Sequence, residues 1–201
     1  MSDSPAPLSR TERAALADLL TELGPDRPTC CEGWTTADLA THLVIRDRRP
    51  DTAPGAVLGG PFGRWTERVA ARTKLETPWP ELLEKLRSGP PALLPTAWGP
   101  VDAVLNTAEM TVHHEDVRRA QPDWTPRALP RSAQDVLWGQ VGFMARTRSH
   151  EGGLELRRSD TGASRTVRSG QPLTTVTGEP LELLLWAGGR DAVARVEVTR
   201  A

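Results

Sequence analysis

The chain has 201 residues, of which 38% are apolar and 25% are charged, a composition typical of one folded domain or of a main domain with a small addition. Its 25 basic and 26 acidic residues leave a net charge of −1, which argues against nucleic acid and anionic membranes as partners because the chain offers them no excess of positive charge. No apolar run approaches the roughly 20 residues of a membrane span, and the amino-terminal segment lacks the apolar core of a signal peptide, so we expect a cytoplasmic protein.

Apolar residues at helical spacing dominate the first three quarters of the chain. They predict four main helices, at residues 9–23, 36–49, 101–120 and 130–148, and two shorter ones, at residues 64–74 and 80–87. The helix at 36–49 follows Thr35, which is spaced with Asp38 as a capping box. Residues 50–63 are rich in proline and glycine and should form a loop. Four main helices with long connections favour a helical bundle.

The pattern changes at about residue 150, where short alternating segments separated by turn residues replace the helical spacing. Strands are expected at residues 154–156, 166–168, 173–176 and 193–198, with a short helix at 179–189 before the last strand. The sequence therefore predicts an α+β protein with a helical domain over residues 1–149 and a small α/β lobe over residues 150–201.

Polar residues interrupt the apolar face of the helix predicted at 101–120. Glu109, His113 and Asp116 share that face, and burying them without partners would cost about 1–3 kcal/mol each. A glutamate and a histidine four residues apart are close enough to bind one metal ion, although such pairs are common on surfaces. His42 lies between Leu39 and Leu43 on the inward face of another helix, where a lone histidine is ordinarily a core residue. Together His42, Glu109 and His113 form a set of two histidines and one carboxylate that leaves positions open on a metal.

Two segments carry a family resemblance. They are CEGWTTADLATHL, from Cys31 to Leu43, and EMTVHHEDVRRA, from Glu109 to Ala120. Both resemble the mycothiol-dependent maleylpyruvate isomerase family of the DinB-like metalloprotein superfamily, and the later stretch GEPLELLLWAGGR is similar to the carboxy-terminal lobe of that family. The resemblance spans nearly the whole chain, but its specific part covers about 25 residues.

The resemblance implies a DinB-like four-helix bundle followed by a lobe similar to sterol-carrier domains, with His42, Glu109 and His113 as metal ligands. It also implies a metal-dependent thiol S-transferase or isomerase that uses mycothiol, a low-molecular-weight thiol, against a small electrophile. Zinc is the first expectation for the metal, and iron, nickel, cobalt and manganese suit the same ligands. Whether the protein forms a homodimer is left open by the sequence.

Two other functions remain open from the sequence. A metal-dependent hydrolase would need a general base, which only Asp38 or Asp116 offers. The other open function is that of a protein that binds a metal or a small ligand without catalysis. Asp38 either caps its helix or orients His42, and Asp116 either orients His113 or pairs with Arg119.

The remaining polar and sulfur residues receive simpler interpretations. His114 and Glu115 are expected on a solvated helix face, and His150 shows no partner. Trp34 should pack in the core, and the adjacent Cys30 and Cys31 are not spaced as metal ligands and are expected to be buried as small apolar groups.

Arginine makes up almost the whole basic content, because Lys74 and Lys85 are the only lysines. This bias suggests a GC-rich genome and agrees with an actinobacterial source. An arginine can clamp a carboxylated ligand with two hydrogen bonds, and the candidates are Arg46, one turn after His42, and, near the lobe junction, Arg146, Arg148 and Arg190. The chain has no tyrosine, so proton transfer must use other groups.

Overall fold

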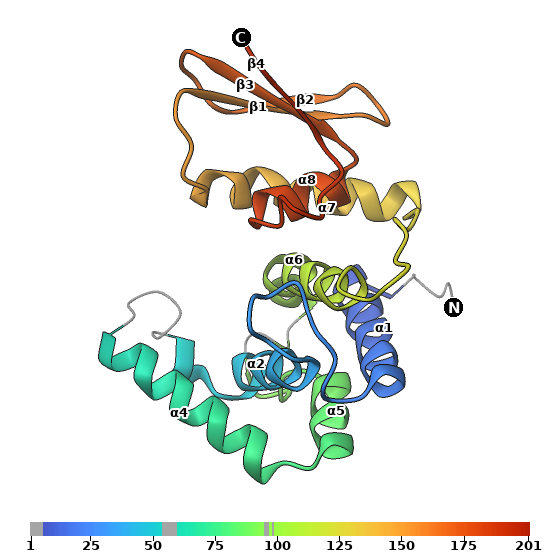
Figure 1. Cartoon of the computed structure of the whole chain (residues 1–201), viewed down its shortest axis with the longest axis vertical. Coiled ribbons are helices and arrows are strands. Elements are labelled where there is room, and N and C mark those ends of the chain that lie inside the picture. The colour runs from blue at the N-terminus through green and yellow to red at the C-terminus, as the bar shows by residue number, and fades with distance from the viewer. Residues whose placement is uncertain (1–5, 54–59, 95–96, 98) are drawn as a thin grey trace. The chain divides into compact units, whose positions relative to one another are not determined.

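The computed structural model describes residues 6–53, 60–94, 97 and 99–201. The chain divides into two compact units, one ending at Thr125 and the other beginning at Pro126. The first unit is helical in its described part, and the second combines helices with a four-stranded sheet (Figure 1), so the protein is α+β as predicted. None of the described helices is long and apolar enough to cross a membrane.

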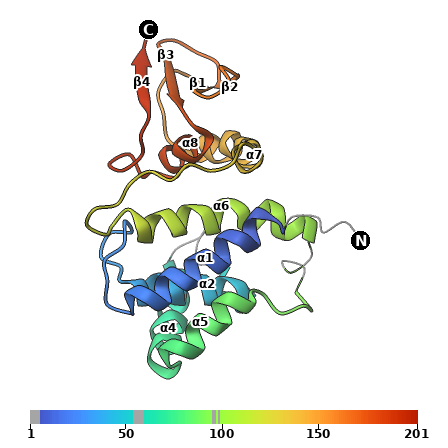
Figure 2. The ribbon, with the colours of Figure 1, turned by 90° about the vertical axis from the view of Figure 1, so that its right-hand side faces the viewer.

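The first unit is built from amphipathic helices around one leucine-rich core. Its elements are α1 (Leu8–Leu23), α2 (Thr36–Arg48), the short 3-10 helix η1 (Pro50–Thr52), α4 (Gly60–Glu76), α5 (Trp79–Ser88) and α6 (Gly99–Arg118). Leucines of α1, α2 and α5 pack with Met110 and Val117 of α6. Helix α1 lies along α6 (Figure 2), whereas α4 packs against α2 and lines a groove beside it.

Helix α2 begins where the capping box predicted it. The Thr35 hydroxyl oxygen accepts a hydrogen bond from the backbone N–H of Asp38, and the Asp38 carboxylate accepts one from the backbone N–H of Thr35. These two bonds satisfy donors that the first turn of a helix leaves without partners. The start of α2 is thereby fixed, and with it the angular position of His42 two turns later.

The second unit is a sheet covered on one face by two helices. It contains α7 (Arg131–Thr147), β1 (Gly153–Arg158), β2 (Ser164–Arg168), β3 (Leu173–Gly178), α8 (Pro180–Ala187) and β4 (Glu197–Arg200). The strand order is β2-β1-β3-β4, with β1 and β3 parallel and both outer pairs antiparallel. Leu156 and Val176 face each other across β1 and β3 and are fully buried. Helices α7 and α8 lie on one face of this sheet (Figure 1).

The placement of α7 differs from the bundle expected from the sequence. The predicted boundary at residues 149–150 grouped this helix with the amino-terminal domain, whereas it packs against α8 and β2 and belongs to the compact unit that begins at Pro126. Its buried face, which includes Leu137 and Val141, is apolar and could pack either in a helical bundle or against α8 and β2. Helical spacing alone therefore could not choose between them.

Two segment boundaries also differ from prediction. Residues 50–63 were expected as a loop, but 50–52 form η1 and 60–63 form the first turn of α4, while 54–59 lie outside the described residues. The last strand was expected at residues 193–198 and runs over Glu197–Arg200 instead. The backbone N–H groups of Val193 and Ala194 both donate to the carbonyl of Arg190, so a turn occupies the residues before it.

Candidate metal centre

The structure brings the three predicted ligands together between α2 and α6. His42 Nε2 lies 3.2 Å from Glu109 Oε1, and His113 Nε2 lies 3.3 Å from the same oxygen. One donor atom from each of the three residues lies within 4.8 Å of the others. The two imidazole rings meet edge to face with centroids 5.3 Å apart. Two imidazole nitrogens and one carboxylate in this arrangement suit a divalent transition metal with positions left for other ligands.

Helix α6 holds two of these residues because Glu109 and His113 are one turn apart and therefore share a face. That face meets α2, whose His42 also points inward, and the three side chains differ in exposure. The exposed fractions of the side chains are 33% for His42, 27% for Glu109 and 10% for His113. The centre is therefore closed on the His113 side and accessible from the His42 side.

The Asp116 carboxylate contacts Nδ1 of His113, the ring nitrogen that does not face Glu109. Its Oδ2 lies 2.9 Å from His113 Nδ1, and the Asp116 side chain is 1% exposed. A carboxylate in this position fixes the tautomer of a metal-binding imidazole and raises its basicity. This geometry corresponds to the orienting role considered for Asp116 from the sequence. Asp38 has other partners, since its Oδ2 accepts from Thr35 and its Oδ1 lies 2.6 Å from Lys74 Nζ, and the predicted capping role is the one observed.

The contrast between the two aspartates gives a direct prediction. Replacing Asp116 by asparagine is expected to weaken the affinity of the site for zinc by about 10- to 100-fold, the usual effect of losing a carboxylate behind a metal-binding histidine. Asp38→Asn is the matched control: zinc affinity should stay within about twofold, because Asp38 contacts Thr35 and Lys74 and not a candidate metal ligand. Competition titrations against a chromophoric chelator measure both affinities. Equal zinc affinities in the two variants would contradict the role assigned to Asp116.

Cys31, expected to be a buried apolar group, is half-buried against the leucine-rich core and also lies beside the candidate metal centre. Its Sγ is 3.3 Å from Asp116 Oδ2 and 4.0 Å from His113 Nδ1. The loop between α1 and α2 brings it there, because the backbone N–H of Cys30 donates to the carbonyl of Asp116. Cys31, His113 and Asp116 also have donor atoms within 4.8 Å of one another. Sequence spacing could not reveal this contact, since 85 residues separate Cys31 from Asp116.

Trp34 and Arg46 border the centre on its accessible side. Trp34 was expected in the core, but it is 37% exposed and its ring lies 5.2 Å from the His42 ring. The Arg46 guanidinium lies 3.4 Å from Glu109 Oε1 and donates to Asn106 Oδ1. Arg46, the weak candidate for cofactor binding, is therefore beside the site. The same arrangement allows it to hold the Glu109 carboxylate in position.

His114 and Glu115 are not on a solvated face. His114 is 6% exposed, and its Nδ1 lies 2.8 Å from Glu12 Oε2 of α1. Glu115 is fully buried and accepts hydrogen bonds from Arg118 and from Arg119, the latter at 2.6 Å. The prediction was wrong because α6 is packed by α1 as well as α2, so polar residues on the side away from His113 are buried too. Glu12 satisfies His114 by a hydrogen bond, and the arginines satisfy Glu115 by ion pairs.

The other predicted residues lie in the second unit. The Arg148 guanidinium pairs with Asp191 and stacks on Trp186, and Arg190 donates to the carbonyl of Gly188. Arg146 is exposed. The backbone carbonyl of His150 accepts from Arg168, whereas its Nε2 is buried without a hydrogen-bond partner among the described residues.

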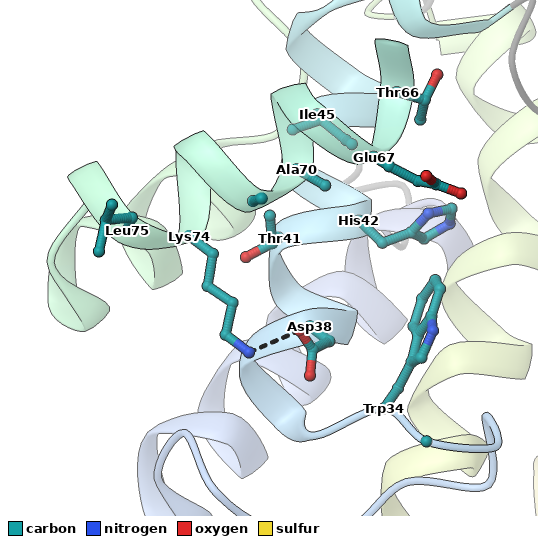
Figure 3. A pocket seen from close by; sticks show the side chains of 12 residues that line it. Trp34, Asp38, Thr41, His42, Ile45, Thr66, Glu67, Ala70, Lys74 and Leu75 are labelled. Carbon is teal, nitrogen blue, oxygen red and sulfur yellow. Dashed lines mark hydrogen bonds and ion pairs between the residues drawn. The ribbon is translucent and has the colours of Figure 1, made fainter. Parts of the chain in front are cut away.

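Two cavities adjoin the candidate centre and share His42. The larger, of about 890 Å³, lies in the groove between α2 and α4 and is lined mainly by apolar groups, including Trp34 and Ile45. The smaller, of about 380 Å³, is lined by Arg46 and Glu109. Figure 3 shows the rings of Trp34 and His42 facing the larger cavity, with the carboxylate of Glu67 pointing from α4 toward His42. Glu67 was not singled out in the sequence, because α4 was not expected to contribute to the site.

The electrostatics of the three residues favour a carboxylate beside an imidazolium. Burial opposes ionisation of Glu109, but hydrogen bonds with His113 and His42 and the nearby charge of Arg46 outweigh it and hold the Glu109 pKa well below its usual range. Burial likewise lowers the His113 pKa, but contacts with Asp116, Cys31 and Glu109 outweigh it and raise the pKa well above 6.5. At neutral pH the metal-free site therefore carries a proton on His113 and none on Glu109.

This charge state predicts that metal binding competes with a proton. Loading zinc near pH 7 is expected to release about one proton, and zinc affinity should rise with pH until the raised His113 pKa is passed. Because the His113 pKa is raised in the folded state, its contribution to metal-free stability is complete below about 6.5 and is lost as pH rises through the raised value. Calorimetric zinc titrations in two buffers of different ionisation enthalpy count the protons. Zinc binding with no proton release at pH 7 would contradict this charge state.

Comparison with known proteins identifies a fold and no close relative. No family model matches the sequence, and no curated protein matches it significantly. A crystal structure of the mycothiol-dependent maleylpyruvate isomerase is similar with a TM-score of 0.65 and 14% identity, over 96% of this chain and 90% of that chain. A mutant of that enzyme with one histidine replaced by alanine gives a TM-score of 0.57 and 15% identity over the same shares. The predicted resemblance is therefore confirmed at the level of the fold.

Proposed function

We propose that this protein is a divalent-metal-dependent thiol S-transferase or isomerase that uses a low-molecular-weight thiol, mycothiol, as the nucleophile toward a small electrophilic substrate. The observation that carries the proposal is the convergence of His42, Glu109 and His113 in a chain whose fold is similar to that of mycothiol-dependent maleylpyruvate isomerase. The fold similarity alone would not support it, because one fold hosts many functions. The three metal-binding donor groups that the two motifs bring together indicate a specific chemistry, which the fold alone does not.

The residues present fit a metal ion. Two imidazoles and a carboxylate are a common donor set for zinc, iron and related metals, and zinc is the first candidate. Support comes from the Asp116 carboxylate behind His113, an arrangement usual behind a metal-binding histidine. A divalent ion held by these three residues would lower the pKa of a thiol that binds to it and so supply a thiolate at neutral pH.

The chain's own residues would orient the reactants. Arg46 lies next to Glu109 and lines the smaller cavity, where its guanidinium can hold the carboxylate of an acidic substrate. Trp34 and Ile45 line the larger cavity and offer an apolar surface on which the carbon chain of a ligand can pack. No protein nucleophile is needed, because the cofactor thiol is the attacking group.

The fold assignment extends to both units. We propose that the first unit corresponds to the DinB-like bundle of the family, and the second to the lobe that is similar to sterol-carrier domains. In this assignment α4 and α5 join α1, α2 and α6 in the helical part. An actinobacterial source, in whose cytoplasm mycothiol is the expected thiol, agrees with the arginine-rich composition.

Turnover with defined metal and thiol content tests the proposal. The zinc-loaded protein is incubated with maleylpyruvate or with a bimane electrophile, with and without mycothiol. We expect conversion that requires both zinc and the thiol and that is lost in Glu109→Gln, a variant of the same size and shape as the wild type. Zinc retained by a folded protein that neither turns over substrate nor binds mycothiol would overturn the proposal and favour a binding protein without catalysis.

Hydrolysis is the second candidate function, and Glu67 is the observation that favours it. Neither aspartate considered as a base is free for that role, since Asp116 holds His113 and Asp38 pairs with Lys74. Glu67 is exposed and points toward His42 (Figure 3), where it could accept a proton from a water. Conversion of an ester or amide without thiol, lost in Glu67→Gln, would select hydrolysis. Thiol-dependent conversion that persists in Glu67→Gln would exclude it.

A further inference from the structure

A third cavity of the first unit is lined by arginines and lies apart from the metal centre. It has a volume of about 550 Å³ and is bordered by α1, the end of α2, the end of α5 and the segment that follows α5. Four arginines line it: Arg10, Arg13, Arg48 and Arg87. No carboxylate is among its described lining residues, and it shares none of them with the two cavities beside His42.

The positive charge of this cavity is only partly compensated. Arg13 pairs with the buried Asp47, and Arg87 lies 2.6 Å from Asp18. Arg10 and Arg48 have no carboxylate partner within the described part of the chain. Nη2 of Arg48 donates instead to Ser88 Oγ and to the Gly89 carbonyl, which ties the end of α2 to the end of α5. Two positive charges therefore remain at a concave surface.

Two guanidinium nitrogens of this cavity also lack hydrogen-bond acceptors among the described residues. Arg13 is 95% buried at its side chain, and its Nη2 has no hydrogen-bond partner among the described residues. The Nε of Arg48 is buried without a partner in the same part of the structure. Buried donors on charged groups are ordinarily satisfied, because leaving one without an acceptor costs its full desolvation penalty. Both nitrogens belong to side chains that line the cavity.

We propose that this arginine cavity binds the oxyanion group of a small metabolite, a phosphoryl or carboxylate group held by Arg10, Arg13 and Arg48. Such groups offer several acceptor oxygens and negative charge, which are the two properties that the cavity lacks. The volume exceeds that of a single phosphate ion, so the rest of the metabolite fits beside its anionic group. This site does not depend on the function proposed for the metal centre.

Binding of simple anions tests the proposal. The full chain is titrated calorimetrically with inorganic phosphate and with succinate, at an ionic strength matched with sodium chloride. We expect saturable binding of at least one, weakened about tenfold in Arg10→Gln and in Arg48→Gln, as expected for the loss of one charge-assisted contact. Tighter binding of phosphate would identify a phosphoryl ligand, and tighter binding of succinate a carboxylate ligand.

The controls separate a site from general charge effects. Arg72→Gln removes the same charge from an exposed arginine of α4 that pairs with Glu76, and it should leave anion binding unchanged. Arg10 is exposed, and its side chain has no hydrogen-bond or ion-pair partner among the described residues, so Arg10→Gln should fold even if Arg48→Gln loosens the contact with Ser88. The proposal is overturned if neither anion binds more tightly than chloride, or if Arg10→Gln and Arg72→Gln bind phosphate and succinate equally well.

Discussion

Replacing His113 by alanine is expected to reduce the divalent metal content from about one ion per chain to less than about one tenth. His113 is the least exposed of the three candidate ligands and has its second nitrogen fixed by Asp116, so its loss removes the most rigid part of the site. His42→Ala should have the same effect on metal content. Plasma emission spectrometry of the purified variants, after exposure to zinc and removal of excess metal, measures the result.

The matched control for these variants is a histidine outside the site. His150→Ala, in the second unit, should retain zinc at the level of the unmodified protein. Because His113→Ala leaves Asp116 buried without its partner, the helical content of each variant is checked by circular dichroism, and the less buried His42→Ala provides the test if His113→Ala fails to fold. Full zinc retention in a folded His42→Ala would remove this residue from the ligand set.

Replacing Glu115 by alanine is expected to lower the free energy of unfolding by about 3–5 kcal/mol, the usual effect of removing one partner of a buried ion pair. The side chains of Glu115 and Arg119 are both 0% exposed, and Arg118 contacts the same carboxylate. The substitution would leave the Arg119 guanidinium without this carboxylate. If Glu115 lay on a solvated face, as its place in the sequence suggested, the change would stay within about 0.5 kcal/mol. Urea unfolding monitored by tryptophan fluorescence distinguishes the two.

Glu76→Ala is the matched control for this stability measurement. Glu76 also pairs with an arginine four residues away, Arg72, but the two side chains are 57% and 77% exposed. Such surface pairs contribute roughly 0–1 kcal/mol, so the control should be nearly neutral. Comparable losses in Glu115→Ala and Glu76→Ala would contradict the burial of the α6 network.

The sequence predicted most elements because local signals determine where helices begin and end. The capping box at Thr35 and Asp38 defined the start of α2, and Gly24 ended α1 as expected. The same reasoning found His42, Glu109 and His113, because each is a polar residue on a face that helical spacing directs inward. A polar residue among apolar residues at helical spacing can be recognised from the sequence alone.

Contacts between distant segments could not be predicted in this way. Cys31, Trp34 and Glu67 approach the centre through a loop and through α4, and no spacing rule connects them with α6. The burial of His114 and Glu115 depends on α1 packing along α6, since periodicity describes only one preferred face of a helix. The apolar face of α7 could equally serve a bundle or a sheet, and its partners α8 and β2 follow only from the tertiary structure.

Cobalt substitution tests the central claim that His42, Glu109 and His113 hold a metal ion that binds a thiol. The protein is loaded with one equivalent of Co²⁺, and its visible and near-ultraviolet spectrum is recorded before and after addition of mycothiol. The account predicts cobalt ligand-field bands in the unmodified protein, a new sulfur-to-cobalt charge-transfer band when mycothiol is added, and neither feature in His42→Ala. A cobalt spectrum that mycothiol does not change, or one that persists in folded His42→Ala, would contradict it.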